Sequence, residues 1–254
     1  MFKYWSLIKK LTLREIKARY KQSFLGLFWV VLNPFFQMLI MSFVFGNIIG
    51  RISDVGIPYP IFLYAGLLPW TFFNLSLTGS MDVFFSNGPL IKKIYFPRQV
   101  LVLSSLLAKA FDFLLASLIF FGLMVFYKMP FTWFVLLFVP IYLLHFIFTY
   151  SLALLLASLN LFYRDVQYLF GLGLQLWFYL TPIIYAVDFF PERYRWIFKL
   201  NPMSVFINAY RQVLLGGDWP NWVSLGTGAL ITLILFIVAN VVFTKLQKSF
   251  ADVV

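Results

Sequence analysis

Residues 22–50 have the sequence QSFLGLFWVVLNPFFQMLIMSFVFGNIIG, a run of 29 residues without one charged side chain. About 20 apolar residues are enough for a helix to cross the hydrocarbon core of a bilayer. Pro34 lies inside the run and is expected to kink that helix or to mark where it widens. The stretch therefore predicts a transmembrane helix, and the remainder of the chain is interpreted in that setting.

The composition excludes an ordinary soluble protein. Of 254 residues, 62% are hydrophobic, 22% are aromatic and only 11% are charged. A soluble domain, a disordered chain and a coiled coil all need many more polar side chains to contact water. The chain has no cysteine, which excludes disulfides and thiol chemistry. The remaining class is a polytopic membrane protein.

Further apolar runs predict five more membrane-spanning helices. Uncharged runs occupy residues 55–81, 129–163, 166–187 and 219–244. A run at about 100–127 is interrupted by Lys109 and Asp112. Each run is long enough to span a bilayer, so the predicted fold is an all-α membrane protein with six transmembrane helices. Residues 1–254 then form a single transmembrane domain.

Three segments outside these runs have a different character. Residues 1–21 place basic side chains at helical spacing opposite aromatic and aliphatic ones, which predicts an amphipathic helix in the cytoplasmic membrane interface. Residues 86–98 combine turn signals with basic residues and predict a small cytoplasmic helix between two turns. Residues 188–218 mix charges with aromatic side chains, so we expect short interfacial or re-entrant helices there.

The distribution of positive charge predicts the orientation. The formal net charge is +11, which in a soluble protein would suggest nucleic acid. In a membrane protein it is attributed first to the positive-inside rule and to anionic lipid headgroups, so no nucleic-acid partner is expected. With six spans, 14 of the Lys and Arg residues fall on the side of the termini and 6 on the other side. The termini are therefore predicted to be cytoplasmic.

The sequence offers little for catalysis. It has no G-x-x-x-x-G-K-[ST] phosphate-binding loop, a single histidine and no closely spaced pair of carboxylates for a metal. We therefore expect no cofactor or metal in this chain, and a transport or channel subunit rather than an enzyme. His145 lies within a span, either as a neutral, hydrogen-bonded packing residue or as a proton relay.

Polar residues in the first and fifth spans have two interpretations. They either line a cavity or join helices by hydrogen bonds. Aromatic residues on the same helices either stack on sugar rings or face lipid. The candidates for a translocation path are Trp29, Asn33, Phe36, Gln37, Gln175, Trp177, Tyr179 and Tyr185.

Charged residues near the predicted cytoplasmic side also leave alternatives open. Lys109 and Asp112 are three residues apart, which favours a local ion pair over a polar element of the path. Segment 86–98 is either a solvated positive loop or a coupling helix that fits a cleft in a cytoplasmic partner. The physical chemistry of the sequence does not choose between these.

Six motifs resemble the type-2 ABC transporter permeases that export polysaccharides. They keep the order and spacing of that family over nearly the whole chain, and the resemblance is strongest to the Wzm-type permeases of O-antigen, the polysaccharide of lipopolysaccharide. The motifs are EIKARYKQSFLGLFW at 15–29, GLLPWTFF at 66–73, IKKIYFPR at 91–98, NLFYRDV at 160–166, LTPIIY at 180–185 and LNPM at 200–203.

The resemblance implies a homodimer of six-helix subunits in the bacterial inner membrane, paired with two copies of a separate ATPase that binds ATP and Mg²⁺. The first and fifth spans of both protomers would surround a path for a polyprenyl-diphosphate-linked glycan, with gate helices in 188–218. The residues that would couple ATP binding to transport are Gly88, Pro89, Leu90, Ile91, Lys92, Lys93, Tyr95, Phe96, Pro97 and Arg98. The residues of the interface helix are Arg14, Glu15, Lys17, Arg19 and Tyr20.

Two finer expectations concern the charges of this helix. Glu15 and Arg19 are four residues apart on its apolar side, which predicts a buried pair that fixes the helix against the first span or the ATPase. Arg14, Lys17 and Arg19 are expected to attract the diphosphate by charge.

Other functions compete with this one. Teichoic-acid and capsular-polysaccharide exporters use permeases of the same type. A membrane enzyme that acts on polyprenyl lipids would need a catalytic carboxylate pair or a histidine cluster, and a passive channel would conduct without an ATPase.

Overall fold

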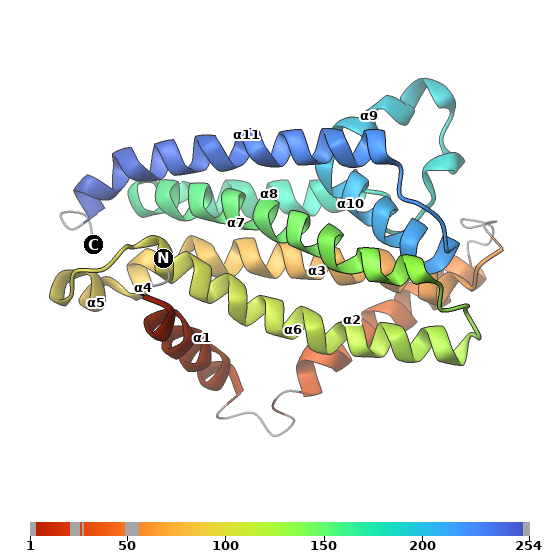
Figure 1. The fold of residues 1–254 in the computed structure, drawn as a ribbon, viewed down its shortest axis with the longest axis horizontal. Helices are drawn as coiled ribbons and strands as arrows, with labels where there is room; N and C mark the ends of the chain where they lie inside the picture. The colour runs from red at the N-terminus through yellow and green to blue at the C-terminus, as the bar shows by residue number, and fades with distance from the viewer. Residues whose placement is uncertain (1–3, 21–25, 27, 49–55, 251–254) are drawn as a thin grey trace.

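A computed structural model of the chain describes residues 4–20, 26, 28–48 and 56–250, and the regular elements in those ranges are all helices. The long helices run side by side along the longest axis of the molecule (Figure 1). Both chain ends lie at one end of this bundle, together with the short helices α4 and α5, whereas α9 and α10 lie at the other end (Figure 1). The two ends are thus built from different parts of the chain.

The helices follow the predicted runs closely. Their bounds are α1 Trp5–Tyr20, α2 Phe28–Met41, α3 Tyr59–Met81, α4 Val83–Ser86, α5 Gly88–Lys93, α6 Gln99–Phe126, α7 Phe138–Phe162, α8 Asp165–Tyr179, α9 Arg195–Leu200, α10 Pro202–Arg211 and α11 Trp222–Leu246. Short helices of other types lie at the ends of these α-helices or between them. The π-helices are η2 Ser42–Ile48 and η6 Gln212–Gly216, and the 3₁₀ helices are η3 Trp133–Leu137, η4 Val187–Phe189, η5 Glu192–Tyr194 and η7 Gln247–Ser249.

Five helical segments in the described ranges are long and apolar enough to cross a membrane. They are Phe28–Gly46, Tyr59–Met81, Gln99–Phe126, Trp133–Phe162 and Trp222–Ser249. These match five of the six predicted spans. The first span was predicted from residue 22, and residues 22–25 and 27 are outside the described part.

The predicted fifth span is shorter than expected. The sequence suggested residues 166–187, but α8 ends at Tyr179 after 15 residues. At about 1.5 Å per residue it is about 22 Å long, less than the hydrocarbon thickness of a bilayer. The hydroxyl of Thr181 donates to the carbonyl of Trp177 at 2.7 Å, and Pro182 has no N–H to continue the helix. The absence of charged residues from 166 to 187 therefore did not predict that α8 ends at Tyr179.

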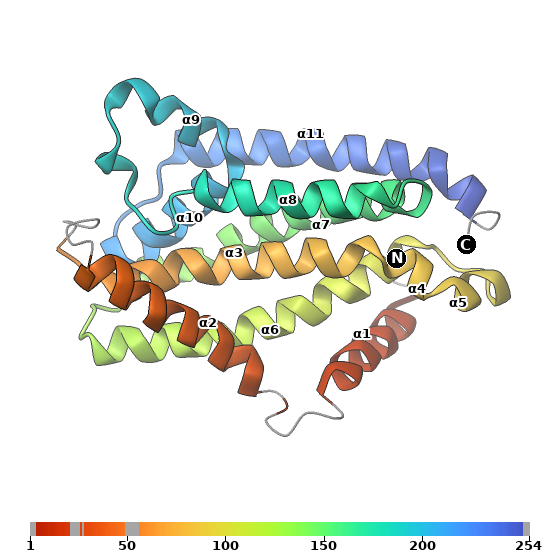
Figure 2. The same ribbon diagram turned by 180° about the vertical axis from the view of Figure 1, so that it is seen from behind.

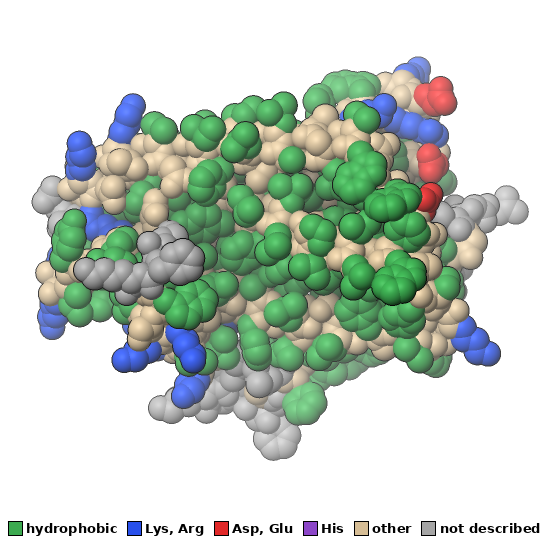
Figure 3. Space-filling model, in the orientation of Figure 1, with side chains coloured by type: hydrophobic (Ala, Val, Ile, Leu, Met, Phe, Trp, Pro, Cys, Tyr) green, Lys and Arg blue, Asp and Glu red, His purple; other side chains and the backbone are tan. Residues whose placement is uncertain are grey.

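The surface has the pattern of a membrane protein. Hydrophobic side chains cover the middle of the face shown in Figure 3, and the blue and red side chains gather at the two ends. The acidic side chains visible on this face lie at the end of the molecule that holds α9, whereas basic side chains are seen at both ends of the molecule (Figure 3). An uncharged band of this kind suits the hydrocarbon core of a bilayer.

Helix α3 forms the centre of the bundle. Its side chains from Ile61 to Trp70 are buried, and it packs against α2, α6, α7, α8 and α10. The hydroxyl of Tyr64 donates to the carbonyl of Ala116 on α6 at 3.1 Å. The ring of Phe73 stacks on Phe148 of α7 at 5.7 Å and meets Trp177 of α8 edge-on at 5.2 Å. Large aromatic side chains therefore fill the space between the helices.

The interpretation of His145 as a packing residue is right in part. Its side chain is fully buried and stacks on Phe206 at 5.2 Å, with Phe72 edge-on at 5.4 Å. Neither ring nitrogen has a hydrogen-bond partner among the described residues, so the expected hydrogen bond is not found. The rings around it in the described part are Phe72, Phe73, Phe206 and Tyr210, an environment typical of packing.

Candidate functional site

The segment 86–98 forms a short helix between turns, as predicted, with a buried base and a projecting tip. Ile91 and Phe96 are buried against the bundle. Lys92 and Lys93 are exposed, and the Tyr95 side chain is 98% exposed, among the most exposed large side chains of the described part. An aromatic and two lysines held out from a fixed base are suited to contact another protein.

A groove of about 740 Å³ lies beside this tip. Residues 91–98 form one wall, and Gln247 and Lys248 at the end of α11 form the other. Arg98 holds the two walls together, because its guanidinium donates to the carbonyl of Gln247 and lies over the ring of Phe250 at 5.4 Å. The other coupling candidates are in the base, with Gly88 buried, Leu90 and Pro97 half-buried, and Pro89 at the surface.

Helix α1 is docked on α6 by polar contacts. The hydroxyl of Ser105 donates to Glu15 at 3.0 Å, and that of Thr12 donates to the carbonyl of Ser104 at 3.3 Å. Arg19 forms an ion pair with Asp112, and both side chains are largely buried. A helix that lies outside the main bundle is thus held by groups that are costly to separate.

These contacts refine one expectation and correct another. Glu15 and Arg19 are turned to the bundle, and the partners found for them in the described part, Ser105 and Asp112, both lie on α6, the third span. Asp112 pairs with Arg19 from another helix, and not with its neighbour Lys109. The spacing of charges along one helix showed that Glu15, Arg19 and Asp112 needed partners. It did not identify those partners, which are about 90 residues away in the sequence.

The remaining charges of α1 have different surroundings. Arg14 donates to the side chain of Asn87 at 2.6 Å and so joins α1 to the start of α5. Lys17 is exposed. The side chain of Tyr20, together with Lys3 and Lys21, lies outside the described residues. Because Arg14 and Arg19 already have protein partners, Lys17 is the most available of the three for the suggested attraction of a diphosphate.

Replacing Arg19 by Gln is expected to loosen α1. Loss of a largely buried ion pair removes about 1–3 kcal/mol of stability. We expect a lower melting temperature in detergent and earlier proteolysis after α1, and Asp112→Asn in the same chain should restore part of the loss. Lys17→Gln, an equal charge change on an exposed side chain, is the control. Equal melting temperatures of R19Q and K17Q would contradict the assignment.

Helices α2 and α8 lie on the same face of the molecule, one on each side of α3 (Figure 2). Six of the path candidates on these helices are exposed, namely Trp29, Asn33, Phe36, Gln37, Gln175 and Tyr179. No hydrogen bond is found for the amides of Asn33, Gln37 or Gln175 in the described ranges. Unpaired amides are costly in lipid, so this face is better suited to protein or water than to acyl chains.

Two of the path candidates have structural contacts instead. Trp177 is half-buried and its indole N–H donates to Asn201 at 2.9 Å. The hydroxyl of Tyr185 donates to the carbonyl of Tyr179 at 2.6 Å. Both side chains hold the turn that follows α8, and whether they also meet a substrate stays a prediction.

A cavity of about 200 Å³ lies between α1, α2, α3 and α6. Trp29 and Asn33 line it together with Arg19, Lys109 and Asp112. Lys109 also passes close to Gly79 of α3, where a Cβ would lie 3.2 Å from the lysine Cε. The charges that interrupt the third span therefore face a cavity between the helices.

Arg211 is the most unusual side chain at the other end of the molecule. It is buried, its guanidinium lies 3.6 Å from the centroid of the Phe62 ring, and it donates to three backbone carbonyls. The acceptors are Phe62 of α3 at 3.2–3.3 Å, Pro182 at 2.6 Å and Ile183 at 2.7 Å. One cation thus joins α10, α3 and the turn after α8.

Asn201 completes this junction. Its amide oxygen accepts from Trp177 and from the backbone N–H of Met203, while its amide nitrogen donates to Leu180 and Thr181. Asn201 belongs to the motif LNPM at 200–203, and no role for its side chain at this junction is predictable from that motif alone. An Asn followed by Pro is a signature of a helix start, and α10 begins at Pro202. Arg211 carried no comparable local signal.

Comparison with known proteins agrees with this architecture. A family model described as ABC-2 type transporter matches residues 6–215. An O-antigen export system permease protein, RfbA, of Klebsiella pneumoniae is 34% identical over 98% of this chain and 95% of the relative. The RfbA protein of Myxococcus xanthus is 31% identical over 99% and 96%. The polysialic acid transport protein KpsM of Escherichia coli is 25% identical over 95% and 94%. The chain belongs to the ABC-2 type transporter family as a multi-pass membrane permease.

Proposed function

We propose that the chain is the membrane subunit of an ATP-driven exporter that moves O-antigen polysaccharide, linked to polyprenyl diphosphate, across the bacterial inner membrane. The relatives at 31–34% identity are named as O-antigen export permeases over nearly their full length. A capsular polysaccharide is the alternative cargo, because KpsM proteins are more distant relatives. Teichoic acid remains a further alternative of the same permease type.

The proposed topology has six crossings, with α8 as a short sixth one. Both termini then lie in the cytoplasm with α5, and α9 and α10 lie outside the membrane as gate helices. The concentration of Lys and Arg at the end that holds the termini supports this orientation. Helix α1 would lie in the cytoplasmic interface, where its exposed Lys9, Lys10 and Lys17 meet lipid headgroups.

A separate ATPase is proposed to supply the energy. The single observation that carries this assignment is the projecting tip of Lys92, Lys93 and Tyr95 above the groove closed by Gln247 and Lys248. Two such subunits, each with ATP and Mg²⁺, would dock on a homodimer of this chain. Motion of the tip would reach α1 through Arg14 and Asn87, and α6 through the contacts of α1.

The polysaccharide path is proposed to run along the face of α2 and α8. Exposed Trp29, Phe36 and Tyr179 offer aromatic surfaces on which sugar rings stack, and the amides of Asn33, Gln37 and Gln175 offer hydrogen bonds to hydroxyls. Apposition of this face with the same face of a second protomer would shield it from lipid.

The function is tested by expressing the tagged chain together with the products of its neighbouring genes and purifying it in mild detergent. We expect a co-purifying ATPase in equal amount, and cells that lack the permease should accumulate lipid-linked O-antigen on the cytoplasmic side. A homodimer that purifies without an ATPase, or export that continues without the permease, would contradict the proposal. Ion conductance of the purified chain alone would favour a passive channel.

A further inference from the structure

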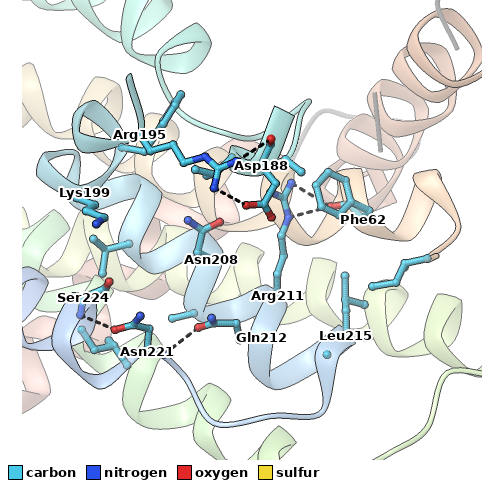
Figure 4. Close-up of a pocket in the computed structure, with 18 residues that line it drawn as sticks. Phe62, Asp188, Arg195, Lys199, Asn208, Arg211, Gln212, Leu215, Asn221 and Ser224 are labelled. Carbon is cyan, nitrogen blue, oxygen red and sulfur yellow. Dashed lines mark hydrogen bonds and ion pairs between the residues drawn. The ribbon is translucent and has the colours of Figure 1, made fainter. Parts of the chain in front are cut away.

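A pocket of about 470 Å³ opens at the end of the molecule opposite to α5. Its walls come from α9, α10, the start of α11 and the residues around Asp188 (Figure 4). Asp188 and Arg195 lie on one side, Gln212 and Asn221 on the other, and Asn208 between them (Figure 4). The pocket is separate from the groove at the coupling tip and from the face of α2 and α8.

The charges that line this pocket do not balance. Three cations, Arg195, Lys199 and Arg211, face a single lining carboxylate. That carboxylate, Asp188, lies 3.4 Å from a guanidinium nitrogen of Arg195, which already neutralises it. Arg211 is paired with no carboxylate in the described part, where its guanidinium donates to backbone carbonyls and lies over the Phe62 ring. The lining therefore keeps a formal excess of two positive charges.

Two of the uncharged polar side chains, Gln212 and Asn221, add to this imbalance, because their amide oxygens already accept hydrogen bonds. The amide oxygen of Gln212 accepts from the backbone N–H of Asn221 at 3.0 Å. The amide oxygen of Asn221 accepts from the backbone N–H of Ser224 at 3.0 Å. Since a backbone N–H can only donate, each amide must turn its oxygen to it and its NH₂ group elsewhere. Gln212 and Asn221 therefore offer a ligand their NH₂ donors.

Lys199 is the freest of these donors. It lies on the pocket wall, its side chain is exposed, and no hydrogen bond or ion pair is found for it in the described ranges. An exposed ammonium group beside two amide NH₂ groups, in a lining with an excess of positive charge, favours a ligand rich in acceptors. A carboxylate or a phosphate has acceptors only and carries the missing negative charge, whereas a neutral sugar hydroxyl both donates and accepts.

We propose that this pocket binds an oxyanion, the carboxylate or phosphate group of an acidic molecule, with Lys199 as its main ionic contact and the amides of Gln212 and Asn221 as donors. The inference rests on the proposed function for its setting, because the pocket lies at the end where an exported chain would leave. The two sources of such a group there are an acidic glycan and the phosphate-bearing headgroup of an outer-leaflet lipid.

Binding to the purified full-length permease tests the proposal. The first probe is hexagalacturonate, with its neutral methyl ester as the matched control, added to protein in an uncharged detergent. The second is phosphatidylglycerol, counted per protein by native mass spectrometry. Lys199→Gln is the test variant. Arg193→Gln is its control, because Arg193 is exposed in the same segment, outside the pocket, and loses the same charge.

We expect K199Q to weaken binding of one acidic probe by about tenfold or more and R193Q to leave it unchanged. An effect on hexagalacturonate alone identifies a glycan site, and an effect on phosphatidylglycerol alone identifies a lipid site. Binding of both probes that is independent of Lys199, or equal loss in K199Q and R193Q, would overturn the proposal. Because this assay needs neither an ATPase nor export, its failure would leave the transport function intact, and loss of the ATPase partner would leave the pocket intact.

Discussion

Replacement of Arg211 by Met is expected to lower the free energy of unfolding by about 2–4 kcal/mol. The carbonyls of Phe62, Pro182 and Ile183 would lose their donor, and each unpaired buried carbonyl costs about 1–3 kcal/mol. Met fills a similar volume without burying a charge, which offsets part of the loss. The change should appear as a large drop in melting temperature of the purified protein in detergent.

The same junction can be disturbed from the opposite side. A Cβ on Gly66 of α3 would lie 2.8 Å from the Arg211 guanidinium and 3.2 Å from the carbonyl of Ile183, so Gly66→Ala should destabilise the protein in the same direction. Arg195→Met is the matched control, because Arg195 contacts only nearby groups of its own segment in the described part. If R211M melts at the temperature of R195M, the guanidinium does not hold the junction.

Reversal of charge at the coupling tip is expected to abolish association with the ATPase. The variant combines Lys92→Glu, Lys93→Glu and Tyr95→Ala, three side chains that project from the bundle. Loss of one aromatic anchor at an interface costs about 2 kcal/mol or more, and two repulsive charges add to it. The expected result is at least a hundredfold loss of co-purified ATPase, with the melting temperature of the permease alone unchanged.

A variant with the same charge reversal at the opposite end separates docking from net charge. Lys128→Glu with Arg193→Glu changes two exposed cations that lie far from α5. This protein should retain its ATPase. Retention of the ATPase by the tip variant, or its loss in the control variant, would exclude segment 86–98 as the docking surface.

The positions of the spans were largely predictable from the sequence, because a bilayer imposes a minimum length of uncharged helix. Residues 55–81 and 219–244 match α3 and α11 to within a few residues. The early end of α8 was not predicted, because it depends on a hydrogen bond of Thr181 and a missing N–H at Pro182. A count of charges does not detect either.

Contacts between distant parts of the chain could not be predicted from local patterns in the sequence. Arg19 and Asp112 are 93 residues apart, and Arg211 and Phe62 are 149 residues apart. Local spacing revealed that Asp112 needed a cation and suggested Lys109, the nearest one. The burial of Arg211 was invisible for the same reason, since its acceptors are backbone carbonyls that every residue has.

The contact between Arg98 and Gln247 has a consequence for biogenesis. The groove beside the coupling tip has one wall from residues 91–98 and one from Gln247 and Lys248 of η7, and near it Phe84 packs on Phe250 at 4.8 Å. Synthesis proceeds from the N-terminus, so the first wall leaves the ribosome long before the second. If the proposed ATPase docks in this groove, a nascent permease whose α11 and η7 have not yet folded offers it only one of the two walls.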